Sequence, residues 1–389
     1  MLDTTAALLQ CPRCRHTPLE LDIEQLALLA GVETKEVSTG TLRCDGCGAV
    51  YPIIGGVAVL VTDVEKYIHA RARGIAHVVR CREDLPSPFA HFYAALTQRP
   101  EGGDCELALM LCSQVANHYG MALDCGAWRG CEALQRWDAA RRFVSVLKQS
   151  PIDKLREYLA EHPSVRGRLI DLGCGVGGAV YAAAMTGCGT AIGVDLSFMQ
   201  IAAARQLVLG APTGMPIHLP DDIMNGVQRP PLDIRLPRPT QCHTDFVVAD
   251  VLNPPLVRGI WQTACAFNVM DVVDEPLRLP EVQWELLEPA GHAFCVDPYL
   301  WNPRALSAVG AKQRTRLQER PAQEAHRLYR EAGFDVTASE DHVPWVFVKR
   351  ARELELYLVH ILTAKKACVD AARTADRATH ASTRGCAPA

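Results

Sequence analysis

Two cysteine pairs near the N-terminus have a spacing that could hold a metal ion. Cys11 and Cys14 form one C-x-x-C pair, and Cys44 and Cys47 form a second. Four thiolates in this pattern can surround one tetrahedral zinc ion in a closed, structural site. The 29 residues between the pairs exceed the common spacing of about 15–20, so we expect an inserted element there, a short helix over residues 21–30. Redox pairs or inert cysteines are the alternative, but two pairs in one short stretch favour zinc.

A glycine-rich turn is the second segment that could do chemistry. Residues 168–178 read RLIDLGCGVGG, an apolar strand that runs into closely spaced glycines and then a helix. The glycines fit both the G-x-G-x-x-G of dinucleotide enzymes and the G-x-G-x-G of S-adenosylmethionine enzymes: Gly173, Gly175, Gly177 and Gly178. Asp171 decides between the two, because its carboxylate would repel a pyrophosphate at the helix N-terminus. The same carboxylate would attract the α-ammonium and sulfonium of S-adenosylmethionine.

A second acidic residue ends the next apolar strand, residues 190–194. Asp195 follows Asp171 by 24 residues, at the place where a carboxylate can accept hydrogen bonds from both ribose hydroxyls of a nucleoside. The helix expected over residues 198–209 stops at Gly210 and completes a second strand–helix unit of a parallel sheet.

The segments LIDLGCGVGGA, AIGVDLS and FVVADVLNPP together resemble the first three motifs of class I S-adenosylmethionine-dependent methyltransferases, over roughly residues 150–350. The resemblance implies an α/β fold with a Rossmann-like seven-stranded sheet and helices on both faces. It also implies that Asp171 and the glycines hold the methionine end, Asp195 the ribose and Asp250 the adenine amine, with Val251 on the ring. The implied cofactor-binding set is Asp171, Gly173, Cys174, Gly175, Gly177, Asp195, Leu196, Asp250 and Val251.

The chain departs from the family in the 55 residues that separate Asp195 from Asp250. The excess lies in a proline-rich insertion over residues 211–243, which is either a substrate-binding flap or a passive surface excursion.

The segment after the second cysteine pair, YPIIGGVAVLV, predicts a strand, a glycine turn and a second strand. With the cysteine pairs it resembles the small zinc-ribbon activator subunits of tRNA, rRNA and release-factor methyltransferases, over roughly residues 7–62. We therefore expect four parts. They are a zinc-ribbon domain at 1–62, a helical connector or lid at 63–150, the methyltransferase domain at 151–366 and a disordered tail at 367–389.

Candidate substrate residues follow two further strands. The strand expected over residues 261–267 delivers Asn268 and Asp271 to its carboxyl end, where ligands of open α/β sheets bind. In the family this loop faces the transferred methyl, which makes both residues catalytic candidates; capping of the following helix is an equal alternative for Asp271. Further substrate candidates follow the strand at 292–296 or precede the glycine loop, where core packing is the alternative: Asp297, Tyr299, Trp301, His118 and Tyr119.

The C-terminal region predicts an antiparallel strand pair at 334–337 and 342–348, then an apolar helix over residues 354–362.

Composition and charge argue against two classes of protein, nucleic-acid binders and membrane-spanning proteins. The 389 residues carry 40 Lys and Arg against 44 Asp and Glu, which gives no basic footprint of a nucleic-acid binder. No apolar run reaches the length of a membrane span, and we expect a cytoplasmic protein. The leading hypothesis is direct in-line methyl transfer to a small metabolite or peptide. Methylation of tRNA, rRNA or a translation factor is the alternative, followed by a non-catalytic cofactor-binding module and a dehydrogenase. The sequence leaves the oligomeric state open.

Overall fold

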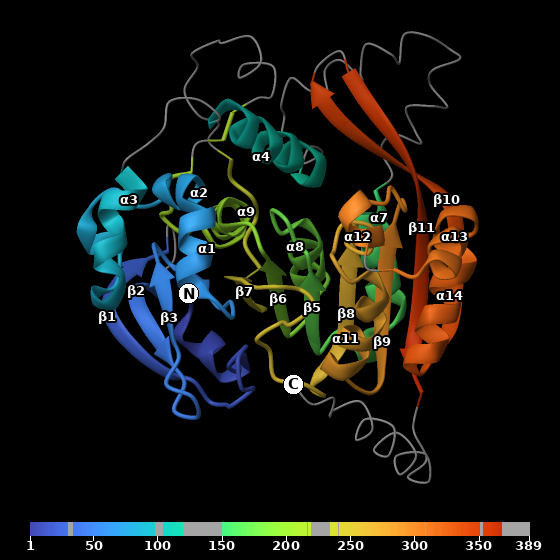
Figure 1. The fold of residues 1–389 in the computed structure, drawn as a ribbon, viewed down its shortest axis with the longest axis horizontal. Coiled ribbons are helices and arrows are strands. Elements are labelled where there is room, and N and C mark those ends of the chain that lie inside the picture. The colour runs from blue at the N-terminus through green and yellow to red at the C-terminus, as the bar shows by residue number, and fades with distance from the viewer. Residues whose placement is uncertain are drawn as a thin grey trace.

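The structure is a computed structural model that describes residues 1–29, 34–97, 104–119, 150–215, 217–218, 234–239, 241–307, 309–350 and 353–367. One mixed sheet runs through the described chain (Figure 1). Its eleven strands lie in the order β1-β2-β3-β4-β7-β6-β5-β8-β9-β11-β10.

Seven of these strands form the predicted methyltransferase sheet. They are β5 (Arg168–Leu172), β6 (Thr190–Asp195), β7 (His243–Val248), β8 (Trp261–Phe267), β9 (Leu287–Asp297), β10 (Phe334–Arg350) and β11 (Glu353–Lys366). Strands β5 to β9 are parallel, whereas β11 runs antiparallel between β9 and β10. Because parallel strands point the same way, the carboxyl ends of β5, β6, β7 and β8 meet at one edge of the sheet. The predicted fold class is confirmed.

Helices cover both faces of this sheet. Side chains of β5 alternate between two buried clusters, since Leu169 belongs to one and Ile170 to the other. The first cluster includes residues of α7 (Pro151–Glu161), α8 (Gly178–Met185) and α9 (Phe198–Ala204), which a π-helical turn (Arg205–Leu209) continues. The second includes residues of α11 (Leu279–Leu286) and α14 (Pro321–Ala332). The remaining helices of this part are α12 (Pro303–Ser307) and α13 (Ala311–Glu319), with 3-10 turns at Pro163–Val165 and Pro276–Arg278.

The cysteine-containing N-terminal part extends the same sheet. It begins with a 3-10 turn (Asp3–Leu8) and forms β1 (Glu20–Leu28), β2 (Lys35–Arg43), β3 (Val50–Ile54) and β4 (Val57–Val59). These four strands pair antiparallel with one another, and β4 then pairs parallel with β7, Ala58 opposite Val247. The ribbon and the catalytic sheet therefore share main-chain hydrogen bonding.

Several helices connect the ribbon to the main domain. In the described part of this segment they are α1 (Val64–Ala70), α2 (Ala72–Ala76), α3 (Tyr93–Thr97) and α4 (Asp104–Tyr119), with 3-10 turns at Arg82–Asp84 and Ser87–Phe92. Figure 1 shows α4 on the same side of the sheet as the turn end of the β10–β11 hairpin, and α4 packs against β10. Residues 120–149, most of the insertion predicted at 211–243 and the predicted tail beyond residue 367 lie outside the described residues.

The helix predicted over residues 21–30 is wrong, because β1 occupies residues 20–28 and pairs with β2. A register shift at Gln25 interrupts the strand alternation. The large apolar residues of this strand lie at 21, 23, 26 and 28. They do not alternate strictly, and the pairs 23/26 and 21/28 have the separations of three and seven that a helix also shows.

The C-terminal prediction is also wrong in part. The two strands expected at 334–337 and 342–348 are one long strand, β10, and the expected helix over 354–362 is β11. Strand β11 has a partner on each side, β9 and β10. Tertiary pairing thus outweighs a local apolar spacing that fits a helix.

A buried ionic cluster joins the ribbon to the catalytic sheet. Arg205, which follows α9, forms ion pairs with Glu36 of β2 and Asp245 of β7, and all three side chains are at most 1% exposed. Asp245 also accepts hydrogen bonds from the backbone N–H of Leu2 (2.8 Å) and the hydroxyl of Thr5 (2.7 Å). Burial alone would raise the pKa of Glu36, but the Arg205 guanidinium holds that pKa below its usual range.

None of the helices in the described ranges is long and apolar enough to cross a membrane.

Candidate functional site

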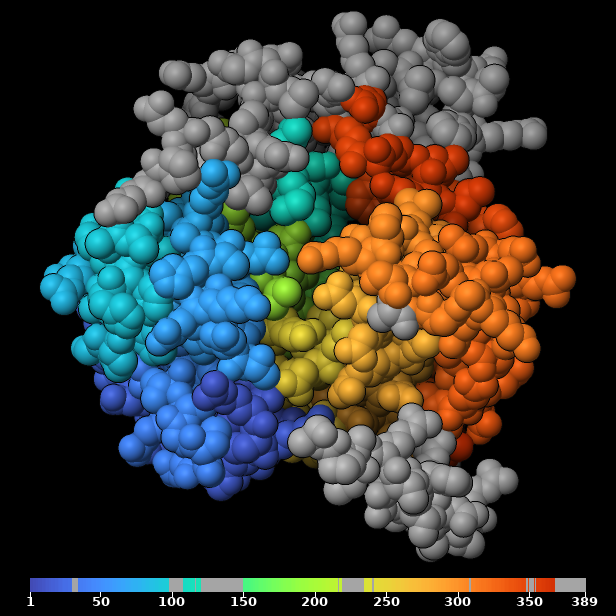
Figure 2. All heavy atoms as spheres, in the orientation of Figure 1, coloured from blue at the N-terminus to red at the C-terminus, as the bar shows by residue number. Residues whose placement is uncertain are grey.

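A cavity of about 670 Å³ lies at the carboxyl ends of the central parallel strands. Residues after β5, β6, β7 and β8 form its floor, among them the loop after Asp171, the segment after Asp195 and Asp250. Residues Arg71, Gln114 and His118 of the connecting helices and Trp345 and Phe347 of β10 form other parts of its wall. In Figure 2 the green and yellow segments of the catalytic sheet lie set back between the blue N-terminal part and the orange C-terminal part.

The glycine loop has a shape that other residues would disturb. Gly173 and Gly177 have φ angles of +78° and +86°, in the left-handed region that favours glycine. A Cβ on Gly173 would also lie 2.5 Å from Val269, and one on Gly177 would lie 2.7 Å from Phe246. The loop therefore packs closely against Val269 and Phe246, and α8 begins at Gly178, directly after it.

Asp171 is the most unusual group in the cavity. Its side chain is 1% exposed, and its Oδ1 atom has no hydrogen-bond partner among the described residues. Burial, and secondarily the nearby Asp195 carboxylate, raises the pKa of Asp171 to about 7. A buried acceptor without a donor is costly, so a cationic ligand group in this cavity would satisfy it.

Asp195 ends β6 beside the glycine loop. Its Oδ2 accepts a hydrogen bond from the backbone N–H of Gly175 (3.0 Å), and its Oδ1 accepts one from Ser197 (2.8 Å). Burial raises the pKa of this carboxyl. Each carboxylate oxygen retains a second lone pair, so Asp195 can still accept hydrogen bonds from a ligand hydroxyl.

The far side of the cavity belongs to the segment after β7. Asp250 is exposed, and its Oδ1 accepts a hydrogen bond from the backbone N–H of Leu252 (2.9 Å). Val251 is 9% exposed, and both residues line the cavity together with Leu196. Eight of the nine predicted cofactor residues thus line one cavity, and the ninth, Gly177, belongs to the same glycine loop without being part of the described lining.

His118 reaches the same cavity from α4. Its Nδ1 accepts a hydrogen bond from the backbone N–H of Gly178 (3.2 Å), the first residue of α8. Burial lowers the pKa of His118 to about 4, so near neutral pH the imidazole is uncharged and carries its proton on Nε2.

A second cavity, of about 590 Å³, adjoins the first; we call it the acceptor cavity. The two cavities share Gln114, Asn268, Val272 and Phe347 as lining residues. Asp271 lines the acceptor cavity, and its Oδ2 accepts a hydrogen bond from the backbone N–H of Leu300 (2.8 Å). Asp271 therefore ties two loops together and caps no helix.

Four other predicted substrate residues lie outside the described lining of both cavities. Asp297 accepts hydrogen bonds from the backbone N–H groups of Met270 (2.9 Å) and Tyr299 (2.8 Å). The polar groups of Tyr119, Tyr299 and Trp301 contact Val176 O, His360 and Leu317 O, respectively. These contacts position loops, and the structure gives none of the four a place against a ligand.

Several residues of the first cavity were not predicted from the sequence, among them Arg71, Gln114, Trp345 and Phe347. They come from elements far from the glycine loop along the chain. Only the alternation of Trp345 and Phe347 along a strand could have placed them on one face.

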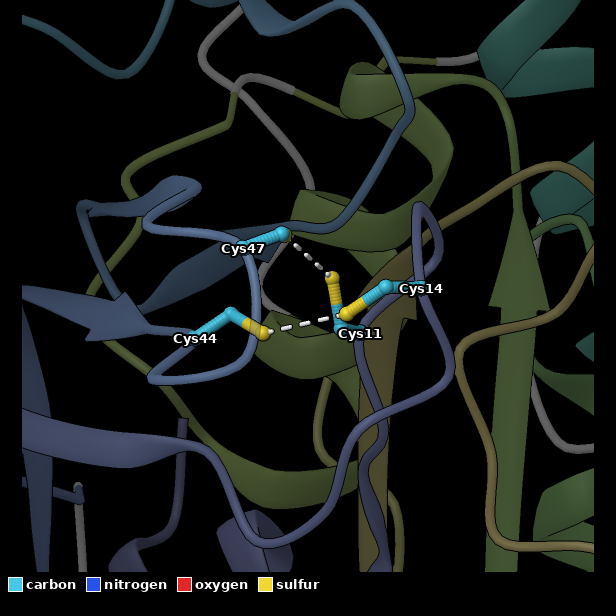
Figure 3. A group of neighbouring side chains, drawn as sticks. All are labelled: Cys11, Cys14, Cys44 and Cys47. Atoms are coloured by element: carbon cyan, nitrogen blue, oxygen red, sulfur yellow. Dashed lines mark hydrogen bonds between the residues drawn. The ribbon is translucent and has the colours of Figure 1, made fainter.

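The four cysteines of the ribbon converge (Figure 3). Their Sγ atoms all lie within 4.8 Å of one another, with Cys11 to Cys47 at 3.6 Å and Cys14 to Cys44 at 3.4 Å. A tetrahedral site with Zn–S bonds of about 2.3 Å requires S···S distances of roughly 3.8 Å. The cluster can therefore hold a zinc-sized ion after small side-chain adjustments.

Comparison with known proteins agrees with this geometry. The family described as "Methyltransferase domain" matches residues 141–339, and the family described as "Trm112p-like protein" matches residues 3–56. No curated protein is similar enough to the chain to count as a match.

Solved structures similar to this chain include a proposed RNA methyltransferase from Pyrococcus horikoshii, at 15% identity and a TM-score of 0.34, covering 57% of this chain and 90% of that one. A complex between the Haloferax volcanii Trm112 methyltransferase activator and a proposed methyltransferase gives 16% identity and a TM-score of 0.34, covering 57% of this chain and 93% of that one. The methyltransferase family match spans more than half of the chain. The chain therefore belongs to the methyltransferase domain family and is a class I S-adenosylmethionine-dependent methyltransferase with a Trm112-like N-terminal region.

Proposed function

We propose that this enzyme methylates a small metabolite or a peptide side chain by direct in-line displacement. The observation that carries the proposal is the pair of adjoining cavities, which share part of their wall. Cofactor and acceptor can occupy neighbouring chambers, and such an arrangement lets alignment supply much of the rate. The acceptor cavity has the size of a small-molecule site.

The larger cavity would hold S-adenosylmethionine. Asp171, whose Oδ1 lacks a donor, would bind the α-ammonium; Asp195 would accept hydrogen bonds from the ribose hydroxyls. Asp250 would accept one from the adenine amine, with Val251 against the ring. When bound, the cofactor supplies a methyl group on a sulfonium sulfur. Asn268, which lines both chambers, would position the acceptor, and Asp271, which lines the acceptor cavity, would receive its proton.

Replacement of Asp171 by asparagine is expected to weaken S-adenosylmethionine binding by about tenfold or more, because a charge-assisted hydrogen bond is lost. In the native enzyme the affinity should rise as the pH rises through about 7, where Asp171 ionises, and in the variant this rise should disappear. Calorimetry over pH 5.5–8.5 measures both. Adenosine, which has no ammonium, is the control ligand and should bind both proteins equally; an unchanged pH profile in the variant would contradict the assignment.

Gly175→Ala tests the cavity by filling it. A Cβ at Gly175 would meet Gln114 and His118 no closer than 3.7 Å, so it fits in the space above the loop. We expect at least a tenfold loss of S-adenosylmethionine affinity. The free energy of unfolding should fall only by the backbone strain of an alanine at positive φ, about 1–2 kcal/mol. Gly187→Ala is the matched control: it has a φ of +92° and open space around it, so it should carry the strain without the loss of affinity.

We also propose that the four ribbon cysteines bind a structural zinc ion. The convergence of four thiols from two C-x-x-C pairs supports this. All four positions would be filled by protein, which leaves none for substrate.

Methylation of tRNA, rRNA or a translation factor is the second candidate. The match of residues 3–56 to Trm112p-like proteins favours it. Such an acceptor would have to present one base or side chain to the acceptor cavity while the rest lies outside.

One experiment separates the two candidates. Purified enzyme and S-adenosylmethionine labelled in the methyl group are incubated with a size-fractionated cell extract, and the labelled fraction is treated with nuclease or protease. Label in the small-molecule or peptide pool is expected. Label released only by nuclease, or held on an intact translation factor, would instead establish the second candidate. If the protein fails to bind S-adenosylmethionine at all, both are wrong and a non-catalytic role remains.

A further inference from the structure

Two residues that line the acceptor cavity each carry an acceptor atom without a donor. Asn268 Oδ1 and Asp271 Oδ1 are both buried and have no hydrogen-bond partner among the described residues. The other oxygen of Asp271 is already engaged with the backbone N–H of Leu300. Buried acceptors are nearly always paired in native proteins, so a ligand that donates hydrogen bonds would satisfy these two atoms.

The charge around the cavity is negative. Among the described side chains that line it, the carboxylates of Asp271 and Glu355 face the ammonium of Lys349. Lys349 pairs with Glu355 (3.0 Å), which also accepts a hydrogen bond from the hydroxyl of Tyr357 (2.6 Å). The charge of Lys349 is thus neutralised within its own ion pair. The buried carboxylate of Asp271, whose Oδ1 has no hydrogen-bond partner among the described residues, attracts a cation and disfavours an anion.

The rest of the lining is apolar and aromatic. Met110, Val272 and Leu300 are 43%, 53% and 60% exposed, unusual for such side chains, and all three border this cavity. The rings of Phe347 and Tyr357 pack edge to face at 4.9 Å. Exposed apolar side chains around a cavity provide a contact surface for an apolar ligand body, and aromatic faces favour a cation.

We propose that the methyl acceptor is an amine, cationic in solution and carried on an apolar body, which binds with its nitrogen between Asn268 and Asp271. This inference rests on the proposed function, because it identifies the chemical class of the acceptor for the same pair of cavities. The Asp271 carboxylate would repel an anionic acceptor, and a neutral hydroxyl would leave that carboxylate without a counter-charge.

The reaction balances with the groups present. An ammonium has no lone pair, so one N–H proton first passes to Asp271 Oδ1. The nitrogen lone pair then forms the N–C bond while the methyl–sulfur bond breaks and leaves its electron pair on sulfur. The product is an N-methylated ammonium, and the proton on Asp271 goes to solvent. Burial raises the pKa of Asp271, which suits a carboxyl that must take a proton from nitrogen.

Binding to the full-length protein tests the class directly. S-adenosylhomocysteine is added so that no turnover occurs, and calorimetry is performed at pH 8. Butyl, cyclohexylmethyl and 2-phenylethyl bodies are each compared as the amine, the alcohol and the carboxylate. For at least one body we expect the amine to bind about tenfold tighter than its alcohol, and the carboxylate to bind weakest. If no body favours its amine, or if no amine binds, the inference is wrong.

Three variants locate the effect. Asp271→Asn should abolish the preference for amine over alcohol, and a preference that survives would exclude Asp271 from amine recognition. Leu300→Ala should weaken amine and alcohol alike, because it removes contact with the body only. Asp335→Asn changes an exposed carboxylate of β10 that lines neither cavity, and it should change neither affinity. The ratio of the two affinities, which a general loss of folding would not alter selectively, is the decisive quantity.

Failure of this inference is distinguishable from failure of the proposed function. If S-adenosylmethionine binds and label enters a neutral small molecule, the proposed function stands and the amine class is wrong. If S-adenosylmethionine does not bind, the proposed function itself is wrong.

Discussion

Replacement of Arg205 by methionine is expected to lower the free energy of unfolding by about 3–5 kcal/mol. The guanidinium is the shared partner of Glu36 and Asp245, both of which are fully buried. Its removal leaves the Asp245 carboxylate without a cation and leaves Glu36 with only the N-terminal ammonium of Met1, at 3.5 Å. Urea unfolding followed by far-ultraviolet circular dichroism measures the loss.

Two comparisons test the cause. Arg43→Met removes a cation whose partner, Glu20, is about half exposed, and it should cost less than about 1 kcal/mol. Combining Arg205→Met with Glu36→Gln and Asp245→Asn removes the orphaned charges and should recover part of the lost stability. If the triple variant is as unstable as the single one, packing of the arginine stem and not its charge explains the effect.

Removal of zinc is expected to unfold the ribbon. If the four thiols hold zinc as proposed, the metal would contribute on the order of 10 kcal/mol, as in small zinc-binding peptides near pH 7. Cys44→Ser should therefore release the metal and lower the melting temperature. Because β4 pairs with β7, we expect the loss to reach the catalytic sheet and to weaken S-adenosylmethionine binding as well.

Metal analysis and thermal unfolding of the same samples check this prediction. Cys81→Ser is the matched control, because Cys81 is an exposed free thiol outside the cluster, and it should retain both metal and stability. A native protein that contains no zinc, or a Cys44→Ser variant with an unchanged melting curve, would show that the thiols are not a structural metal site.

The sequence predicted what depends on local pattern. The glycine loop and Asp195 follow apolar strands at a spacing that predicts their place at the sheet edge. The spacing of the two cysteine pairs likewise predicts that the four thiols cluster. Pairing partners were not predictable in this way. The segments now seen as β1 and β11 carry apolar spacings that fit a helix, and only their neighbours in the sheet decide their conformation. Likewise, Arg71 and Trp345 line the first cavity because of tertiary packing, which no local sequence pattern predicts.

The catalytic candidates show the same division. Asn268 and Asp271 were predicted from their place after a strand, and both line the acceptor cavity. Tyr299 and Trp301 follow a neighbouring strand in the same manner, yet their polar groups are bonded to His360 and Leu317. Position after a strand brings a residue to the edge, but its rotamer and the surrounding loops determine which way it faces.

The pairing of β4 with β7 has a consequence for how the chain folds. Val59 lies opposite Val248, so about 190 residues separate two strands that are adjacent in space, and closing so large a loop is slow. Strands β1 to β4, by contrast, pair with one another within the first 60 or so residues, which emerge first during synthesis. These four strands can pair before β7 is synthesised, and the proposed zinc ion could bind at that stage. The ribbon then already presents strand β4, and β7 of the catalytic sheet pairs with it after β7 has been synthesised.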